Sequence, residues 1–483
     1  MYINKKLKNI TIKTKKTNML KRNKSSIKSN GSFLEVLKIA LPLILSQSCR
    51  AVNMFTDRLM LSRYSQDAAA ASFTGGLTNF TLVCIFVGTI GYTGTFVAQY
   101  EGARHRERIG SAVWQGIYMA LVGALFVVGF TAISTPLFET FKHDVNITKL
   151  AVEYFDILCI GCFVFLMNLA ISSFWTGRGK TNFVLVVSVI VTILNIPFNY
   201  FAIFGCETLN LASYGTKGAA VATILAEGVG LVIYFIAFLS KNTHRHFNSR
   251  EIKIDFPLLK RMLKFGLPNG IHLAIDLIGF NTFSLLLGRY GADVHAASAV
   301  SFGIHTIAFC PIIGVGMTVA ILVGQGVGAQ DIPLAKKGIK NSSILIIIYS
   351  ILMVMLFTVF QNILIEPFEC NENASKLAGV MLYLISVYLC FNGAVMILSN
   401  VLRGAGDTKF PMWTMSVVGI CCFAIPCVIL YSCGFPWWSL WIAFNIEFML
   451  LAIVFYLRYR QGKWTKMKVI ELEANKNAIA IEE

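Results

Sequence analysis

The sequence predicts an all-α integral membrane protein in which twelve transmembrane helices form two pseudo-symmetric six-helix lobes. Of its 483 residues 56% are hydrophobic and only 14% are charged, and the mean hydropathy is +0.66. Roughly a quarter of the residues of a soluble domain are charged, so this composition suits a lipid environment. A series of long apolar segments and an internal repeat give the number of helices and their division into lobes.

The apolar segments are long enough to cross a bilayer, because a transmembrane helix needs about 20 consecutive, mostly apolar residues. Membrane barrels have short alternating segments instead, so helices are expected. Most of the segments are apolar on every face, as is typical of helices surrounded by lipid and by one another. The expected spans are 34–62, 70–98, 110–134, 153–175, 183–204, 217–240, 262–288, 297–324, 341–364, 379–402, 411–433 and 435–457.

The chain repeats itself at an offset of 226 residues. "LKIALP" in the first span corresponds to "LKFGLP" in the seventh, and Gln99 corresponds to Gln325. Further on, "GRGKTNF" from Gly177 corresponds to "GAGDTKF" from Gly404 at an offset of 227. Because six is an even number, both halves enter the membrane from the same side, which makes the repeat parallel. Two equal lobes that rock about the midplane would open a path to each side in turn, and this favours a transporter.

The repeat and the charges divide the chain into five expected parts. The first is a basic, disordered cytoplasmic tail, followed by an N-terminal six-helix lobe, a cytoplasmic linker between the lobes, a C-terminal six-helix lobe and a cytoplasmic C-terminal tail. In that order the parts cover residues 1–32, 33–240, 241–261, 262–457 and 458–483.

The formal net charge of +17 reflects topology. Counted along alternate connections, one side of the expected bundle holds most of the 42 Lys and Arg residues, and the other side holds six. By the positive-inside rule both termini face the cytoplasm, and the chain belongs in the inner membrane of a cell. A nucleic-acid surface would not alternate in this way, so no nucleic-acid partner is expected.

Polar side chains interrupt several spans. Asp57 lies in the first and Asp276 in the seventh, and a charge at mid-bilayer costs about 2.5–3.5 kcal/mol on insertion scales. Asn195 and Asn199 lie four residues apart in the fifth span, on one helix face, beside Pro197, which would bend the helix. Amide and carboxylate oxygens suit a small hard cation, so Asp57 and Asn199 are candidate Na⁺ ligands. The alternative is that the asparagines only join neighbouring helices.

Arg50 is a candidate counter-charge for these acids. It lies seven residues before Asp57, on about the same helix face, and it holds the repeat position of Asp276. We expect Arg50 to balance one of the two aspartates in one conformational state. Glu227 and Glu447, in the sixth and twelfth spans, are equally well explained as buried structural contacts.

No set of catalytic residues is recognisable in the sequence. The seven histidines are scattered, His272 and His305 are each alone in a span, and there is no glycine-rich phosphate loop. Cys159 and Cys162 have CxxC spacing, but a zinc site would need a second pair in polar surroundings. We therefore expect neither enzymatic activity nor a cofactor.

Together these motifs resemble the multidrug and toxic compound extrusion (MATE) transporters. "LKIALP" leading to "TDRLMLSRY", "LNIPFNYFAIFG" and "LRGAGDTKFP" spread the resemblance over nearly the whole chain after residue 32, and "LRGAGDT" is the most specific of them. The resemblance implies two lobes around a V-shaped cavity. It also implies export of organic, often cationic, drugs and toxic compounds in exchange for entering Na⁺ or H⁺. We expect a monomer in contact with membrane lipid.

The resemblance also implies roles for individual residues. Asp57 matches the first-helix aspartate implicated in cation coupling, and Asn195 and Asn199 match the positions beside it. In proton-coupled, DinF-like members an aspartate tends to stand in place of Asn199, so the NorM-like branch is favoured. Asp276 matches an acidic seventh-helix position of that branch, and Asp407 matches the tenth-helix aspartate of its second-lobe cation site.

Arg50 and four aromatic residues are candidates for the wall of the substrate cavity, because aromatic rings can hold organic cations by cation–π contacts. Aromatic residues in such a bundle more often serve simply in packing. The candidates are Arg50, Phe55, Phe280, Phe283 and Tyr290.

Two other kinds of transporter share parts of this pattern. A flippase-type exporter of a lipid-linked or other amphipathic metabolite would have much the same architecture, and it stays open as the alternative function. A major-facilitator carrier also has twelve spans but would carry an Asp-Arg pair in the loop after its second span. This chain has "QYEGARHRERIG" there, which argues against that class.

Overall fold

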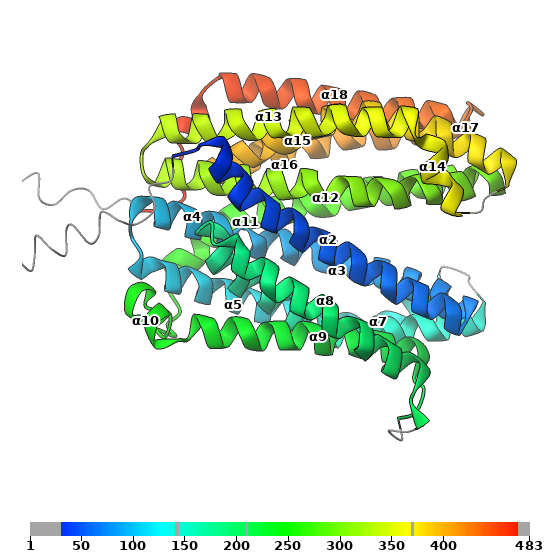
Figure 1. Cartoon of the computed structure of the whole chain (residues 1–483), viewed down its shortest axis with the longest axis horizontal. Coiled ribbons are helices and arrows are strands. Elements are labelled where there is room, and N and C mark those ends of the chain that lie inside the picture. The colour runs from blue at the N-terminus through cyan, green and yellow to red at the C-terminus, as the bar shows by residue number, and fades with distance from the viewer. Residues whose placement is uncertain (1–29, 141–143, 208–210, 369–370, 472–483) are drawn as a thin grey trace, which may run out of the picture.

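The computed structural model describes residues 30–140, 144–207, 211–368 and 371–471, and over these residues the chain is a bundle of long helices (Figure 1). The first half contains α2 (Phe33–Tyr64), α3 (Gln66–Gly91), α4 (Thr93–Ala103), α5 (Glu107–Gly129), η2 (Phe130–Ile133), α6 (Ser134–Glu139), α7 (Val145–Gly177), α8 (Thr181–Phe204) and α9 (Gly215–Phe238). The connection contains α10 (Lys241–Phe247). The second half contains α11 (Phe256–Gly288), α12 (Ala292–Gly328), α13 (Ile332–Val359), α14 (Gln361–Ile365), η4 (Glu366–Phe368), α15 (Glu372–Ala405), α16 (Lys409–Val418), η5 (Gly419–Ala424), α17 (Ile425–Ser432), α18 (Trp438–Arg460) and η6 (Lys463–Lys466).

The membrane-spanning character follows from helix length and composition. Within the described residues, 11 helical segments are long and apolar enough to cross a membrane. The remaining long helix is α2, whose 32 residues include the polar side chains of Arg50, Asn53 and Asp57. With α2 the bundle has twelve membrane-length segments, so the predicted all-α membrane fold is confirmed.

Polar residues at the helix starts set the boundaries. Ser32 Oγ accepts a hydrogen bond from the backbone N–H of Glu35 at 3.3 Å, and α2 begins directly after this cap. Asp255 Oδ1 caps α11 by accepting from the N–H of Leu258 at 3.0 Å. Each cap satisfies an N–H group that has no partner within its own helix. The first helix of each half therefore starts at a defined residue.

Two hydrophobic clusters form the cores of the two lobes. One is built mainly from α3 to α9 and the other mainly from α11 to α18. In Figure 1 the second-half helices α12, α13, α15 and α18 lie above the first-half helices α5, α7, α8 and α9, and α2 runs obliquely between the two groups.

The first helix of each half crosses from one lobe to the other. In α2, Val36 and Leu43 pack with Leu322 of the second half, whereas Leu61 packs in a cluster with other first-half residues. The start of α11 likewise lies in the first-half cluster, through Met262 and its neighbours, and its later residues lie in the second-half cluster. These two helices therefore join the lobes near their starts.

Both ends of the described chain lie at the same end of the bundle (Figure 1). We call this end, where α2 and α11 start and α4 and α12 finish, the basic end. Helices α3 and α11 approach closely towards it, since a Cβ atom added to Gly88 of α3 would lie 2.5 Å from the Cα of Gly270 in α11. Such contacts require glycine.

The expected linker and tails differ in detail from their sequence boundaries. The linker 241–261 contains α10 and the first turn of α11. Residues 1–29 and 472–483 of the expected tails lie outside the described residues. The described part of the C-terminal tail packs against the bundle: α18 continues to Arg460, and Trp464 and Val469 are each 2% exposed.

Candidate functional site

Asp57 lies in the later part of α2, where this helix packs against α8 and α9 of its own lobe. Asn199 Nδ2 donates a hydrogen bond to Asp57 Oδ1 at 2.5 Å, and Thr223 Oγ1 donates to Asp57 Oδ2 at 3.3 Å. Asn199 comes from α8 and Thr223 from α9. Three helices of the first half therefore meet at one carboxylate.

Three asparagines of α2 and α8 have buried side-chain oxygens that lack a hydrogen-bond partner among the described residues. The Oδ1 atoms of Asn53, Asn195 and Asn199 are buried and make no hydrogen bond within the described residues. Asn53 and Asn195 each lie one helical turn before Asp57 and Asn199, on the same helix faces. A buried acceptor without a partner costs about 1–3 kcal/mol, and oxygen atoms are the ligands of hard cations. The group can therefore take up a small cation, or a proton on the carboxylate.

A cavity of about 520 Å³ lies in the second lobe. Its walls come from α11, α12, α15, α16, η5 and α18, and Phe80 of α3 reaches it from the first half. Cavities of about 300–1,000 Å³ hold small organic ligands. The polar side chains in its wall include His272, Asp276, His305, Asn392, Arg403 and Glu447.

The cavity wall combines two acids with one arginine. Asp276, Glu447 and Arg403 line the same cavity. The Arg403 guanidinium is fixed by donating to Asn269 Oδ1 at 3.1 Å and to Ser399 Oγ at 2.9 Å. The two acids offer oxygen atoms beside one fixed guanidinium, and these oxygens could bind a metal cation, a proton or an organic cation.

Aromatic rings make up much of the remaining wall. The His305 ring stacks on Phe309 with a centroid distance of 5.5 Å, and the Tyr388 ring lies 4.7 Å from Phe444. Phe280 lines the same cavity. Aromatic faces attract cations and pack against flat apolar groups, so the cavity suits an amphipathic, positively charged molecule.

In this conformation Arg50 does not pair with Asp276, one of the two aspartates that it was expected to balance in one conformational state. The Arg50 guanidinium carbon lies 5.6 Å from the centroid of the Phe165 ring, in the first lobe. Among the described residues no ion pair joins Arg50 to Asp276, and Arg403 is the basic side chain that shares the cavity with Asp276. Arg403, rather than Arg50, is the arginine in the cavity with Asp276, because α15 brings it there although it is distant from Asp276 in the sequence.

Of the aromatic residues expected to line a cavity, only Phe280 is found in the wall of the second-lobe cavity. Phe283 is fully buried in the core and stacks on Phe444 at 5.1 Å, because α11 turns this side chain towards α18. Tyr290 lies at the end of α11 and donates its hydroxyl to a backbone oxygen at 2.9 Å. Phe55 is 67% exposed and is not part of that wall.

The structure does not bring Asp407 to Asp276. Helix α15 ends at Ala405, Gly406 turns the chain at φ 114°, and Asp407 follows at the basic end. There Asp407 Oδ2 accepts from Arg458 Nε at 2.8 Å and from Nη2 at 2.7 Å, and the aspartate is 6% exposed. Asp407 therefore fastens α18 to the end of α15, and it is absent from the cavity wall.

Several residues of these sites are visible only after folding. His272 and Asp276 share a face of α11 by their spacing of four, which the sequence could have indicated. Glu447 and Arg403 come from other helices, and no spacing connects them to α11. Nothing in the sequence indicated that Thr223 binds Asp57, because a threonine in an apolar span usually donates a hydrogen bond to the backbone of its own helix.

Comparison with known proteins decides the family. The MatE family model matches residues 42–201 and 268–430, one segment in each half and more than half of the chain in total. The chain belongs to the MatE family. This is the multidrug and toxic compound extrusion (MATE) family that the sequence motifs resemble, so that prediction is confirmed.

Several known proteins are similar to this chain over nearly its whole length. A "Probable multidrug resistance protein NorM" from Pasteurella multocida is 24% identical over 442 residues, covering 88% of this chain and 93% of that protein. A protein of the same name from Thermotoga maritima is 24% identical over 449 residues, covering 91% and 94%. A solved MOP superfamily transporter from Pyrococcus furiosus has a TM-score of 0.82 at 18% identity and covers 92% of this chain and 100% of that one. The relatives' names agree with the predicted NorM-like branch, and the structure supports the fold.

Proposed function

We propose that this MATE-family membrane protein is an antiporter that exports organic, often cationic, drugs and toxic compounds in exchange for entering Na⁺ or H⁺. The curated relatives carry the name multidrug resistance protein, which supports drugs as the exported class. Export by alternating access requires that the ion and the drug bind the two states of the transporter with different affinities.

The observation that carries the proposal is the carboxylate of Asp57, which accepts hydrogen bonds from Asn199 and Thr223 near buried amide oxygens that have no partner among the described residues. An ionisable group inside a membrane protein is costly, and it is retained where an ion or proton must bind. Loading of Asp57 would satisfy the free oxygens and remove the charge, and this would change the balance between the two states.

The second-lobe cavity supports the choice of an organic cation as cargo. Its volume of about 520 Å³ fits a drug-sized molecule, and its wall combines aromatic rings with Asp276 and Glu447. The same acids could hold a second entering cation, in which case drug and ion would compete for the cavity. The proposed exchange then follows from electrostatics, because both cargoes would neutralise the same carboxylates.

The proposed orientation places the basic end in the cytoplasm and the chain in the inner membrane. The excess of Lys and Arg at one end supports this orientation through the positive-inside rule. Drug export and ion entry then run in opposite directions across that membrane.

The test is transport of a fluorescent organic cation by the purified protein in proteoliposomes, with a Na⁺ gradient and a pH gradient imposed separately. We expect one gradient to drive dye movement against its concentration difference, and an ionophore that dissipates this gradient to abolish it. Proteoliposomes without protein control for passive leak. If neither gradient drives the dye while a labelled lipid-linked substrate moves across the bilayer, the alternative of a flippase-type exporter replaces this proposal.

A further inference from the structure

The two lobes are joined at the basic end by two hydrogen bonds that the repeat relates to each other. Gln99 Nε2 of the first half donates to the backbone oxygen of Gly404 at 3.0 Å. Gln325 Nε2 of the second half donates to the backbone oxygen of Gly177 at 3.0 Å. Gln99 and Gln325 hold equivalent positions in the two halves, as do Gly177 and Gly404. The closure of this end is therefore nearly two-fold symmetric.

The backbones around these glutamines touch. A Cβ atom added to Gly102 would lie 2.1 Å from the backbone oxygen of Gln325, and one added to Gly328 would lie 2.0 Å from that of Gln99. Helix α4 and the end of α12 therefore lie against each other, and a path from the basic end into the space between the lobes requires them to separate.

A segment after α18 breaks the symmetry of this closure. We call residues 463–471 the C-terminal strap. It starts in the second lobe, where the Trp464 ring stacks on Tyr459 with a centroid distance of 5.7 Å and belongs to the second-lobe cluster. Five residues later the strap has reached the first lobe, because Val469 and Ile470 belong to the first-lobe cluster.

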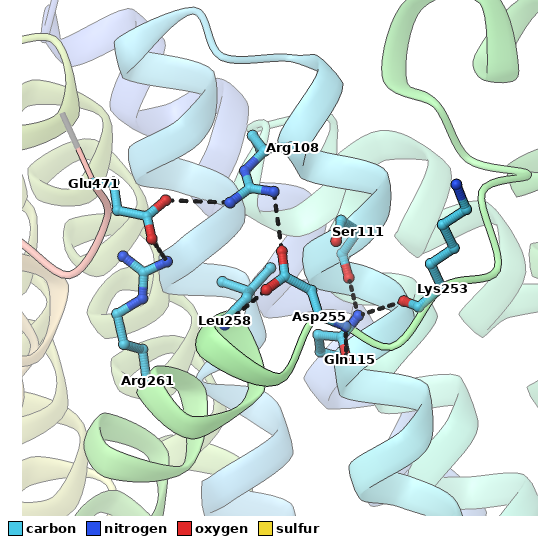
Figure 2. Close-up of polar contacts among 8 residues, drawn as sticks. All are labelled: Arg108, Ser111, Gln115, Lys253, Asp255, Leu258, Arg261 and Glu471. Atoms are coloured by element: carbon cyan, nitrogen blue, oxygen red, sulfur yellow. Dashed lines mark hydrogen bonds and ion pairs between the residues drawn. The ribbon is translucent and has the colours of Figure 1, made fainter. Parts of the chain in front are cut away.

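The far end of the strap is held by hydrogen bonds and ion pairs. The backbone N–H of Val469 donates to Gln99 Oε1 at 3.1 Å. Glu471 Oε2 accepts from Arg108 Nη2 at 3.2 Å, and Glu471 Oε1 pairs with Arg261 (Figure 2). Arg108 also binds Asp255, the capping residue of α11, at 3.0 Å. The strap therefore docks where α4, α5 and α11 come together.

Gln99 connects the strap to the closure. Its amide nitrogen donates across the lobes while its amide oxygen accepts from the strap, so both ends of one fully buried side chain are satisfied. Gln325 makes the equivalent bond across the lobes, but among the described residues no hydrogen bond joins its side chain to the strap. A chain of five residues spans at most about 16–18 Å, so a strap anchored in both lobes limits their separation.

We propose that the C-terminal strap is a latch on the closure of the basic end and acts through Gln99. Docking of the strap favours the state in which this end is closed, and undocking of residues 469–471 accompanies its opening. Gln99 is a positioning residue in this step, because it orients both the strap and the facing lobe without touching cargo.

The experiment measures the distance between the lobes at the basic end by double electron–electron resonance on the reconstituted full-length protein. Spin labels are placed at Glu107→Cys in the first half and Lys336→Cys in the second half, both exposed positions, after replacement of the native cysteines. One variant ends after Met467 and loses the docked end of the strap but keeps Trp464. The matched control ends after Glu471 and keeps every described contact of the strap.

We expect truncation after Met467 to raise the population with the longer distance at least threefold, and truncation after Glu471 to leave it unchanged. Gln99→Met should raise this population more in the longer chain than after truncation at Met467, because the bond to Gly404 is lost in both backgrounds and the bond to the strap only in the longer chain. Gln325→Met should raise the population with the longer distance by the same factor in the chain that ends after Glu471 and in the chain that ends after Met467.

Equal distance distributions for the two truncations would overturn the proposal, as would coupling of Gln325 to the strap as strong as that of Gln99. If the truncation after Met467 does not fold, as judged by gel filtration, Glu471→Gln provides the comparison, with the exposed Glu251→Gln as its charge-matched control. Glu471→Gln should then raise the long-distance population and Glu251→Gln should not. Identical distributions for these two variants would also overturn the latch. None of these readouts depends on which ion or drug is transported.

Discussion

Asn in place of Asp57 removes a negative charge and changes the shape of the side chain very little. The new amide oxygen can accept from Asn199 Nδ2, as the carboxylate does at 2.5 Å, and the new amide nitrogen can donate to the Thr223 hydroxyl. The helix contacts around the site stay in place. We therefore expect Asp57→Asn to be produced and folded like the wild type, with ion coupling lost.

The size of the effect follows from the electrostatics of the site. Two unit charges 4 Å apart attract by about 4 kcal/mol at an effective dielectric constant of 20. Asp57 is half-buried, and partial access of solvent weakens the attraction to about 2 kcal/mol. Since about 1.4 kcal/mol corresponds to a tenfold change in affinity, the variant should bind the entering cation roughly 30-fold more weakly.

The assay is dye transport in proteoliposomes over a range of imposed ion gradients, with Asp67→Asn as the matched control. Asp67 is exposed in the first turn of α3, so the same chemical change there should leave transport unaltered. Gradient-driven transport should fall to background in Asp57→Asn at ion concentrations that saturate the wild type. An Asp57→Asn protein with the ion dependence of the wild type would refute the assignment of Asp57 as the coupling site.

Three further variants test the surrounding structure. Phe283→Ala should lower the free energy of unfolding by about 3–5 kcal/mol, because it opens a cavity in the core; an unchanged melting temperature in detergent would contradict this packing role. Arg458→Met should destabilise the protein by about 3–5 kcal/mol by leaving Asp407 buried without its partner, and the additional change Asp407→Asn should restore most of the melting temperature. If the double variant is as unstable as Arg458→Met, the ion pair is not the cause. Gly328→Ala should push α12 away from Gln99, since its Cβ would lie 2.0 Å from a backbone oxygen, and an unaltered resonance distance at the basic end would count against this tight approach.

The composition and the repeat were sufficient to predict the architecture. A chain with so few charged residues must place its helices in lipid, and an offset kept over both halves can only arise from two similar lobes. The sequence also indicated Asp57 and Asn199 as partners, because both interrupt apolar helices and a buried charge needs an oxygen or nitrogen neighbour. Their hydrogen bond agrees with that expectation, although the cation role itself is still a prediction.

The contacts between distant helices could not be read from spacing along one helix. Arg50 was expected to balance Asp57 or Asp276 in one conformational state, and in this conformation its guanidinium lies against Phe165. The cavity is instead completed by Arg403 from α15 and Glu447 from α18, which join Asp276 through packing of three helices. Phe283 was expected in a cavity, but the rotation of α11 about its own axis directs it into the core, and the hydropathy of a fully apolar helix does not encode that rotation.

The sequence by itself determined that the helices lie in lipid, how many there are, that the chain is duplicated and which family it belongs to. These properties depend on composition and on the order of residues along the chain. The tertiary structure alone decided which polar groups meet, that Asp407 binds Arg458 at the basic end, and that residues 463–471 cross from one lobe to the other. The physical reason is that these contacts depend on the distances and rotations of packed helices. Many sequences with the same apolar periodicity would pack their helices at other distances and rotations, and would therefore bring other polar groups together.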